Sequence, residues 1–263
     1  MTAGTTPAWA AHDTTSAALG ALAAEGATGA LTGERGVFYL TAGRVAHVES
    51  AHTPDLGVLL VRGGALTEDG WWAAIDRDGA RHRVARRLVD DGRLAAGALE
   101  LCHLGALFDA AYFALGHDTR AHRFRPGAAH WLGVVRPVPV RTVLRESRRR
   151  RDLLHDIWPD PLVDVAPLAR AAAAEPAALP ARRGRVLALV DGVRTAADIA
   201  VALACRTYHT LVELRRLAAD GLVTTAARVP AQATGSAPDP CGAAWDDPDA
   251  ALLRRLRDAL EAL

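Results

Sequence analysis

The sequence predicts an α+β fold with a small antiparallel β-meander and several helices, then a three-helix module, then a terminal amphipathic helix. Three observations support this prediction. Residues 29–50 hold three short β-prone runs separated by glycine turns. Residues 95–115 are apolar on almost every side, which is typical of a core helix. Two stretches rich in proline and alanine then interrupt the helical pattern.

The chain has 263 residues, enough for two domains that each bury a core. Proline and glycine give the boundaries between them. We expect a disordered start at 1–13, a first domain at 14–157, a linker or packed connector at 158–181, a second domain at 182–228, another linker at 229–246 and a terminal helix at 247–263.

Composition limits the classes of function. The formal net charge is +1, so any contact with nucleic acid would depend on a local basic patch. All 31 basic residues are arginines. The three cysteines are far apart and form no CxxC pair, which favours reduced thiols and a cytoplasmic location. No signal peptide is evident, and no apolar run approaches the roughly 20 residues that a membrane span needs.

The last strand of the predicted meander alternates in character. Val45, His47 and Glu49 alternate with Ala46 and Val48, as in a half-buried strand. We expect His47 and Glu49 to lie on an exposed polar face, with an acid/base pair as the alternative.

The first domain resembles a known family. A helix precedes GALTGERGVFYLTAGRVAHVES (29–50), helical hairpins follow, and RPVPVRTVLRESRRR (136–150) ends the pattern. This order resembles the PatA-type amino-terminal domain, a bacterial family, over roughly residues 14–155. The resemblance implies a regulatory or protein-interaction module, often joined to receiver domains or winged helices, and it implies no catalytic residues.

The second domain has the order of signals of a winged helix-turn-helix. An apolar helix ends at Asp191-Gly192, Thr195 and Asp198 are spaced to cap a second helix, and Thr207 is placed to cap a third. A β-prone run, 222–225, would start the wing. Residues 182–228 include eight arginines and four acidic residues, which gives this segment a local net charge of +4.

In such a fold the third helix enters the major groove of double-stranded DNA. The residues expected to face the bases are Arg206, Thr207, Tyr208, His209, Thr210, Glu213 and Arg216. The phosphate contacts expected from this module are Arg182, Arg183, Arg185, Arg194, Arg215 and Arg228. Docking of proteins is the alternative use, because this face offers little for reading bases.

A second basic stretch lies in the first domain. Arg141, Arg145 and Arg148 share one helix face at i, i+4 and i+7 and would contact a DNA backbone. A solvated helix end is the alternative. The leucine stripe of 247–263 is too short to be stable alone, so it would pack on its own chain, on a partner protein or on a second copy as a homodimer.

Chemistry-bearing motifs are sparse. His117, His122 and His130 have no acid cluster beside them, and no G-x-S-x-G or Walker A motif occurs. We therefore expect no enzyme, no catalytic residues, no metal and no cofactor. The predicted function is a bacterial transcriptional regulator, nucleoid-associated when bound to DNA, whose N-terminal domain controls the winged helix. The alternative is a signalling adaptor in which both domains bind proteins and no DNA is contacted.

Overall fold

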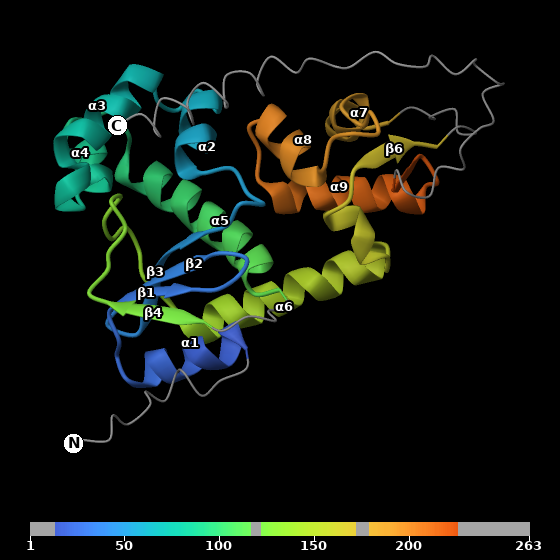
Figure 1. The fold of residues 1–263 in the computed structure, drawn as a ribbon. Helices are drawn as coiled ribbons and strands as arrows, with labels where there is room; N and C mark the ends of the chain where they lie inside the picture. The colour runs from blue at the N-terminus through green and yellow to red at the C-terminus, as the bar shows by residue number, and fades with distance from the viewer. Residues whose placement is uncertain (1–13, 117–121, 172–178, 226–263) are drawn as a thin grey trace, which may run out of the picture. The chain divides into compact units, whose positions relative to one another are not determined.

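The computed structural model describes residues 14–116, 122–171 and 179–225, and it is an α+β structure (Figure 1). These residues belong to one compact unit, residues 1–229. The predictions for 1–13, 229–246, the terminal helix at 247–263 and Arg228 lie outside the described residues. Among the described helices, none combines the length and the apolar character that crossing a bilayer requires.

The predicted antiparallel meander is confirmed. Its strands are β1 (Gly29–Thr32), β2 (Val37–Thr41) and β3 (Arg44–Glu49). A tight turn joins β2 to β3, with positive φ at both Ala42 (46°) and Gly43 (72°), as hairpin turns require. Strands β4 (Arg123–Pro126) and β5 (Val138–Pro139) complete the sheet in the order β4-β1-β2-β3-β5.

Three helices pack on this sheet and form the first core. They are α1 (Thr15–Ala24), α5 (Ala96–Ala114) and α6 (Val140–Ile157) (Figure 1). The first core includes Leu19, Phe38, Leu107 and Val143, all fully buried. Burying side chains of this size stabilises a fold by about 1.5–3 kcal/mol each relative to leaving them exposed.

A second core lies among three shorter helices, α2 (Leu56–Arg62), α3 (Glu68–Asp78) and α4 (Val84–Asp90). The hydroxyl of Thr67 caps α3 by accepting the amide of Gly70. Trp71, Leu88 and Leu132 fill this core.

The third core joins the last three described helices to the ends of α5 and α6. Helices α7 (Ala181–Ala188), α8 (Ala196–Ala202) and α9 (Thr207–Ala219) follow in the predicted order, and Thr195 with Asp198 forms the predicted capping box. Tyr112 and Phe113 of α5 and Leu154 of α6 pack into the same core. The three helices are therefore built onto the N-terminal part of the chain.

The expected connector at 158–181 contributes to this packing. It holds a 3-10 turn, Pro161–Asp164, and strand β6 (Leu168–Arg170), which pairs antiparallel with β7 (Val223–Thr225). The strand that pairs with β7 thus precedes α7, and the wing beyond Thr225 lies outside the described residues. The winged-helix assignment stays a prediction.

Candidate functional site

The first site is the docking of α9 on α5. Asp109, 1% exposed, accepts the amide of Thr207 on Oδ2 at 2.7 Å and the amide of Tyr208 on Oδ1 at 2.8 Å. The Thr207 hydroxyl, predicted to cap α9, instead donates to the carbonyl of His52 at 3.0 Å. A carboxylate from another helix therefore satisfies amides that a local cap would otherwise bind.

This docking covers much of the predicted reading face. Thr207 is 0%, Tyr208 6% and Thr210 1% exposed, so the prediction that these three face outward is wrong. Thr207 shares one face of α9 with Leu211 and Leu214, four and seven residues later, and this apolar face packs inside the protein. Arg206, His209 and Glu213 are half-buried, and Arg216 is exposed.

A buried guanidinium completes the contact. Arg150 of α6 lies with Cζ 4.5 Å from the centroid of the Tyr208 ring and Nη1 3.8 Å from Oδ1 of Asp109, and its Nε donates to Glu146 at 3.0 Å. Burial raises the pKa of Asp109 to about 6, although the amides of Tyr208 and Thr207 and the charge of Arg150 oppose this rise. The carboxylate is thus largely ionised at neutral pH and is held by opposing dipoles and charge.

Arg215, predicted to contact phosphate, is buried within the protein, so that prediction is wrong. It is 4% exposed and forms a bidentate pair with Asp164 at 2.8 and 2.7 Å. The remaining guanidinium nitrogen donates to the carbonyls of Leu154, at 3.1 Å, and Trp158. Arg215 therefore joins α9 to the C-terminal end of α6.

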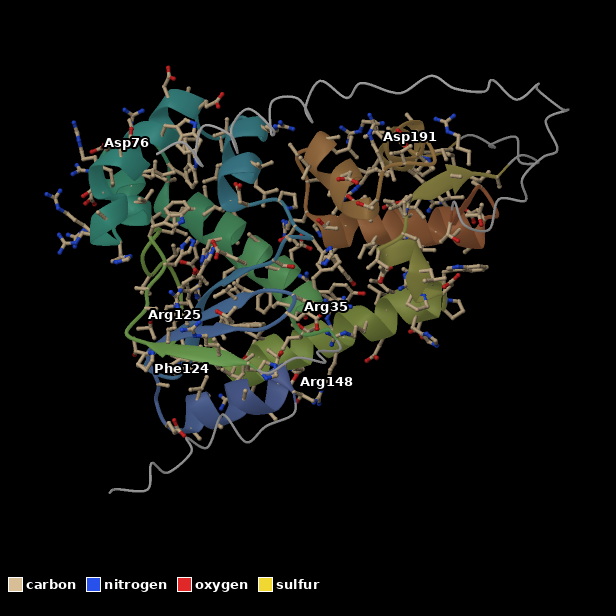
Figure 2. The ribbon with its side chains drawn as sticks, in the orientation of Figure 1. Arg35, Asp76, Phe124, Arg125, Arg148 and Asp191 are labelled. Atoms are coloured by element: carbon tan, nitrogen blue, oxygen red, sulfur yellow. The ribbon has the colours of Figure 1, made fainter. Side chains whose placement is uncertain are left out.

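Other predicted phosphate contacts already have acidic partners. Arg183 is 3.4 Å from Glu213 and 2.9 Å from Asp220. Arg194 is 3.1 Å from Asp191, which lies in the turn before α8 (Figure 2). Arg182 and Arg185 are exposed.

The arginines of α6 divide between two environments. Arg141, Arg145 and Arg148 are exposed and line one shallow surface, which we call the α6 ridge (Figure 2 labels Arg148). Inward, Arg151 donates to the carbonyls of Tyr112 at 3.1 Å and Leu115 at 2.7 Å, the last turn of α5. Asp152 lines the same surface, and among the described residues no ion pair joins Arg141, Arg145 or Arg148 to an acidic group.

The second site is a histidine cluster beneath a cavity: His47, Glu49, His103 and His130, with Tyr39 beside them. His47 is 7% exposed, so the prediction of an exposed polar face is wrong for this residue. The sequence could not show that α5 and the loop after β4 cover β3. Nδ1 of His47 lies 3.2 Å from Nε2 of His103, and the rings of His47 and His130 stack with centroids 3.9 Å apart.

The hydrogen bonds fix the proton on one ring. The Leu132 amide donates to Nδ1 of His130 at 3.2 Å, so Nε2 of His130 carries the proton and donates to Glu49 at 2.9 Å. The hydroxyl of Tyr39 donates to the other oxygen of Glu49 at 3.0 Å. The bond from His130 lowers the pKa of Glu49, which is therefore ionised at neutral pH.

Burial determines the charge of the other two rings. It lowers the pKa of His103 to about 4 and that of His47 well below its ordinary value, and the neighbouring His130 adds to both shifts. Both rings are neutral at pH 7, so one donates and the other accepts in the bond between them. The cluster thus consists of a hydrogen-bonded His47–His103 pair stacked on His130, which together with Tyr39 donates to the one ionised carboxylate.

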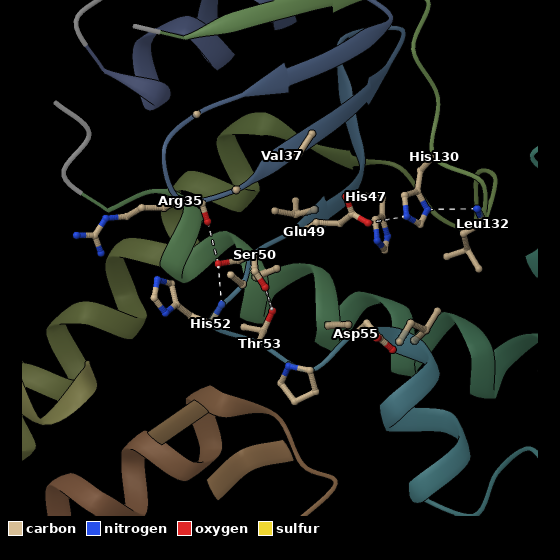
Figure 3. Close-up of a pocket in the computed structure, with 18 of the residues that line it drawn as sticks. Arg35, Val37, His47, Glu49, Ser50, His52, Thr53, Asp55, His130 and Leu132 are labelled. Atoms are coloured by element: carbon tan, nitrogen blue, oxygen red, sulfur yellow. Dashed lines mark hydrogen bonds and ion pairs between the residues drawn. The ribbon is translucent and has the colours of Figure 1, made fainter. Parts of the chain in front are cut away.

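The cavity above the cluster has a volume of about 470 Å³, within the range of small-molecule sites. Figure 3 shows His47, Glu49 and His130 at one end of the cavity. Ser50, His52 and Thr53, in the loop that follows β3, lie further along it. Apolar walls come from Val48, Leu56, Ala106, Ala110, Trp131 and Leu132.

His47, Glu49 and His130 could together hold a metal ion, judged by the spacing of their ligand atoms. Ligand atoms of His47, Glu49 and His130 lie within 4.8 Å of one another. A metal would have to displace the proton on Nε2 of His130, and the Leu132 amide then opposes a proton on Nδ1. The set thus fits a hydrogen-bonded polar wall better than a metal centre.

Comparisons with protein-family models, with curated proteins and with solved structures gave no significant match. The resemblance of residues 14–155 to the PatA-type domain therefore remains a prediction.

Sequence reasoning missed Asp109 and His103 as site residues. Each is an isolated polar side chain in the apolar helix α5, and that isolation was the available signal. A buried carboxylate or imidazole needs a partner. The sequence cannot identify that partner, which for Asp109 lies 98 residues away.

Proposed function

We propose that this chain is a signalling adaptor that acts through protein contacts, and that α9 is a structural helix of its folded unit. One observation carries the proposal: buried Asp109 accepts the first two amides of α9. These amides would lie near DNA phosphates in a helix-turn-helix complex. While Asp109 holds them, α9 cannot enter a major groove with its N-terminus.

The energy of release supports this choice over a DNA-binding function. Two hydrogen bonds to a charged group contribute roughly 1.5–3 kcal/mol each, so freeing the α9 N-terminus forfeits about 3–6 kcal/mol of bonding, which the return of Asp109 to solvent offsets in part. Exposing the ring of Tyr208 adds to that cost. Effector binding typically couples about 1–3 kcal/mol between sites, which is too little to make the released state dominant.

The α6 ridge supplies a surface for a partner. Arg141, Arg145 and Arg148 are exposed on one helix face, and guanidinium groups bind carboxylates in a planar, bidentate geometry. We infer that an acidic protein segment binds there.

A second function is favoured by the position of Asp109 itself. Its carboxylate lies where a DNA phosphate would meet the helix amides, as expected of a DNA-binding regulator whose reading helix is masked. In that case a strong input would displace α9 from α5.

Duplex DNA titrated with the full chain at several salt concentrations tests both functions. The adaptor function predicts only weak DNA binding that falls steeply with salt. This weak binding should be lost in the triple variant Arg141→Ala/Arg145→Ala/Arg148→Ala. The masked-regulator function predicts that Asp109→Ala, if folded by circular dichroism, binds DNA at least tenfold more tightly. Tight wild-type binding that depends on Arg216 would overturn the adaptor proposal.

A further inference from the structure

The arginines of the three-helix module fall into two groups. In the described part, 179–225, Arg183, Arg194, Arg215 and Arg216 each form an ion pair with a carboxylate. Within the same part, no ion pair joins the other three to an acidic group. These are Arg182, Arg185 and Arg206.

All three arginines of the second group line one cavity. It has a volume of about 490 Å³ and is also lined by Leu59 of α2, Cys102 of α5, and His209 and Thr210 of α9. No aspartate or glutamate is among its described lining residues. Three guanidinium groups thus share one concave site without a carboxylate in its described lining, although Asp109 and Glu213 act on Arg206 and His209 from outside it.

The cavity holds one arginine in a defined place. Gly105 of α5 lies directly against the guanidinium of Arg206, and a Cβ atom at that position would collide with it. The absence of a side chain on Gly105 lets Arg206 lie flat on the helix. Arg206 is therefore positioned by the protein more closely than a freely moving surface arginine.

Two further properties describe a ligand. Burial lowers the pKa of His209 to about 4, and the charges of Arg206 and Arg182 add to this shift, so His209 is neutral at pH 7. Leu59, Val186 and Leu203 provide apolar wall for an organic body. A duplex could not insert into a cavity of this size, which suits ligands of metabolite dimensions.

We propose that this cavity binds a small phosphorylated molecule, with Arg182, Arg185 and Arg206 as its phosphate ligands. Guanidinium groups match phosphate oxygens bidentately, and three of them suit a doubly charged phosphate ester. This site is independent of the adaptor function and of the histidine cluster.

Calorimetric titration of the full chain with inorganic pyrophosphate, AMP and ATP tests the proposal. We expect saturable binding by at least one probe, weakened tenfold or more in Arg185→Gln and in Arg206→Gln. Arg194→Gln and Arg216→Gln, which remove paired arginines outside the cavity, should bind within about twofold of the wild type.

Gly105→Ala provides a second variant that is expected to fold, because alanine favours a helix over glycine by up to about 1 kcal/mol. It should displace Arg206 and weaken binding by threefold or more. No saturable binding of any probe at millimolar concentration would overturn the proposal. It would also fail if the paired-arginine variants lost as much affinity, or if duplex DNA bound through the same arginines and pyrophosphate did not compete.

Discussion

The α9 contact and the histidine cluster are both buried polar sites on α5, but they differ in how fully their bonds are used. Both oxygens of Asp109 accept amides of α9, and Asp109 is only 1% exposed. In the histidine cluster, the Glu49 side chain is 45% exposed beside a cavity, and no described hydrogen bond occupies Nε2 of His47. The α9 contact, in which Asp109 holds Thr207 and Tyr208, therefore serves to join two helices. The histidine cluster still has hydrogen-bonding groups that a ligand could use.

The largest change in stability should come from removing the carboxylate that holds α9 on α5. Asp109→Ala leaves two amides of α9 without their acceptor and removes the carboxylate 3.8 Å from Arg150, and we expect it to lower the free energy of unfolding by about 3–5 kcal/mol. Asp198→Ala is the matched control, because it removes a local cap on the exposed start of α8 and should cost about 1 kcal/mol. Urea denaturation measures both. Equal losses would show that Asp109 is an ordinary cap.

Acid should destabilise the protein through the histidine cluster. The folded-state pKa of His103 is about 4, below its ordinary 6.5, so the unfolded chain takes up the proton first. The contribution of neutral His103 to the free energy of unfolding is fully present above pH 6.5. As the pH falls towards 4, the protein loses about 3 kcal/mol of stability from this residue. Unfolding free energies measured at pH 7 and pH 4 should differ less in His103→Gln than in the wild type. An unchanged difference would contradict this.

Asp109 should change the stability in the opposite direction: its contribution to the free energy of unfolding should rise as the pH falls. The folded-state pKa of Asp109 is about 6, above its ordinary 3.8, so the folded chain takes up the proton first. Relative to Asp109→Asn, the wild type should gain about 2 kcal/mol of stability between pH 7 and pH 4. Denaturation of the two proteins across this range provides the measurement. A wild type that loses stability relative to the variant on acidification would mean that the amides of α9, not burial, dominate the pKa.

The sequence predicted what depends on local signals. The glycine turns within 29–50 and the capping box of Thr195 and Asp198 both involve residues within a few positions of one another. Strand and helix order followed from them. The strand β3 was also recognised from its alternation, although the environment of His47 was not.

What the sequence could not show depends on contacts between distant residues. Tyr208 has the same neighbours in the sequence whether it faces DNA or α5, and only the packing of α9 on Asp109 decides between them. Arg215 likewise looked like a phosphate ligand because its partner, Asp164, lies 51 residues earlier in the chain. Hydrophobic periodicity identifies the apolar face of a helix but does not show what covers its polar face.

The pairing of β6 with β7 determines where the C-terminal part of this chain can be cut. A fragment that begins at Arg182 lacks β6 and Asp164, so β7 becomes an unprotected edge strand and Arg215 loses its counter-ion. Such a fragment would also expose the α9 amides and the ring of Tyr208. DNA retention by that truncated piece would reflect surfaces created by the cut, so the minimal unit for binding studies starts in the N-terminal half.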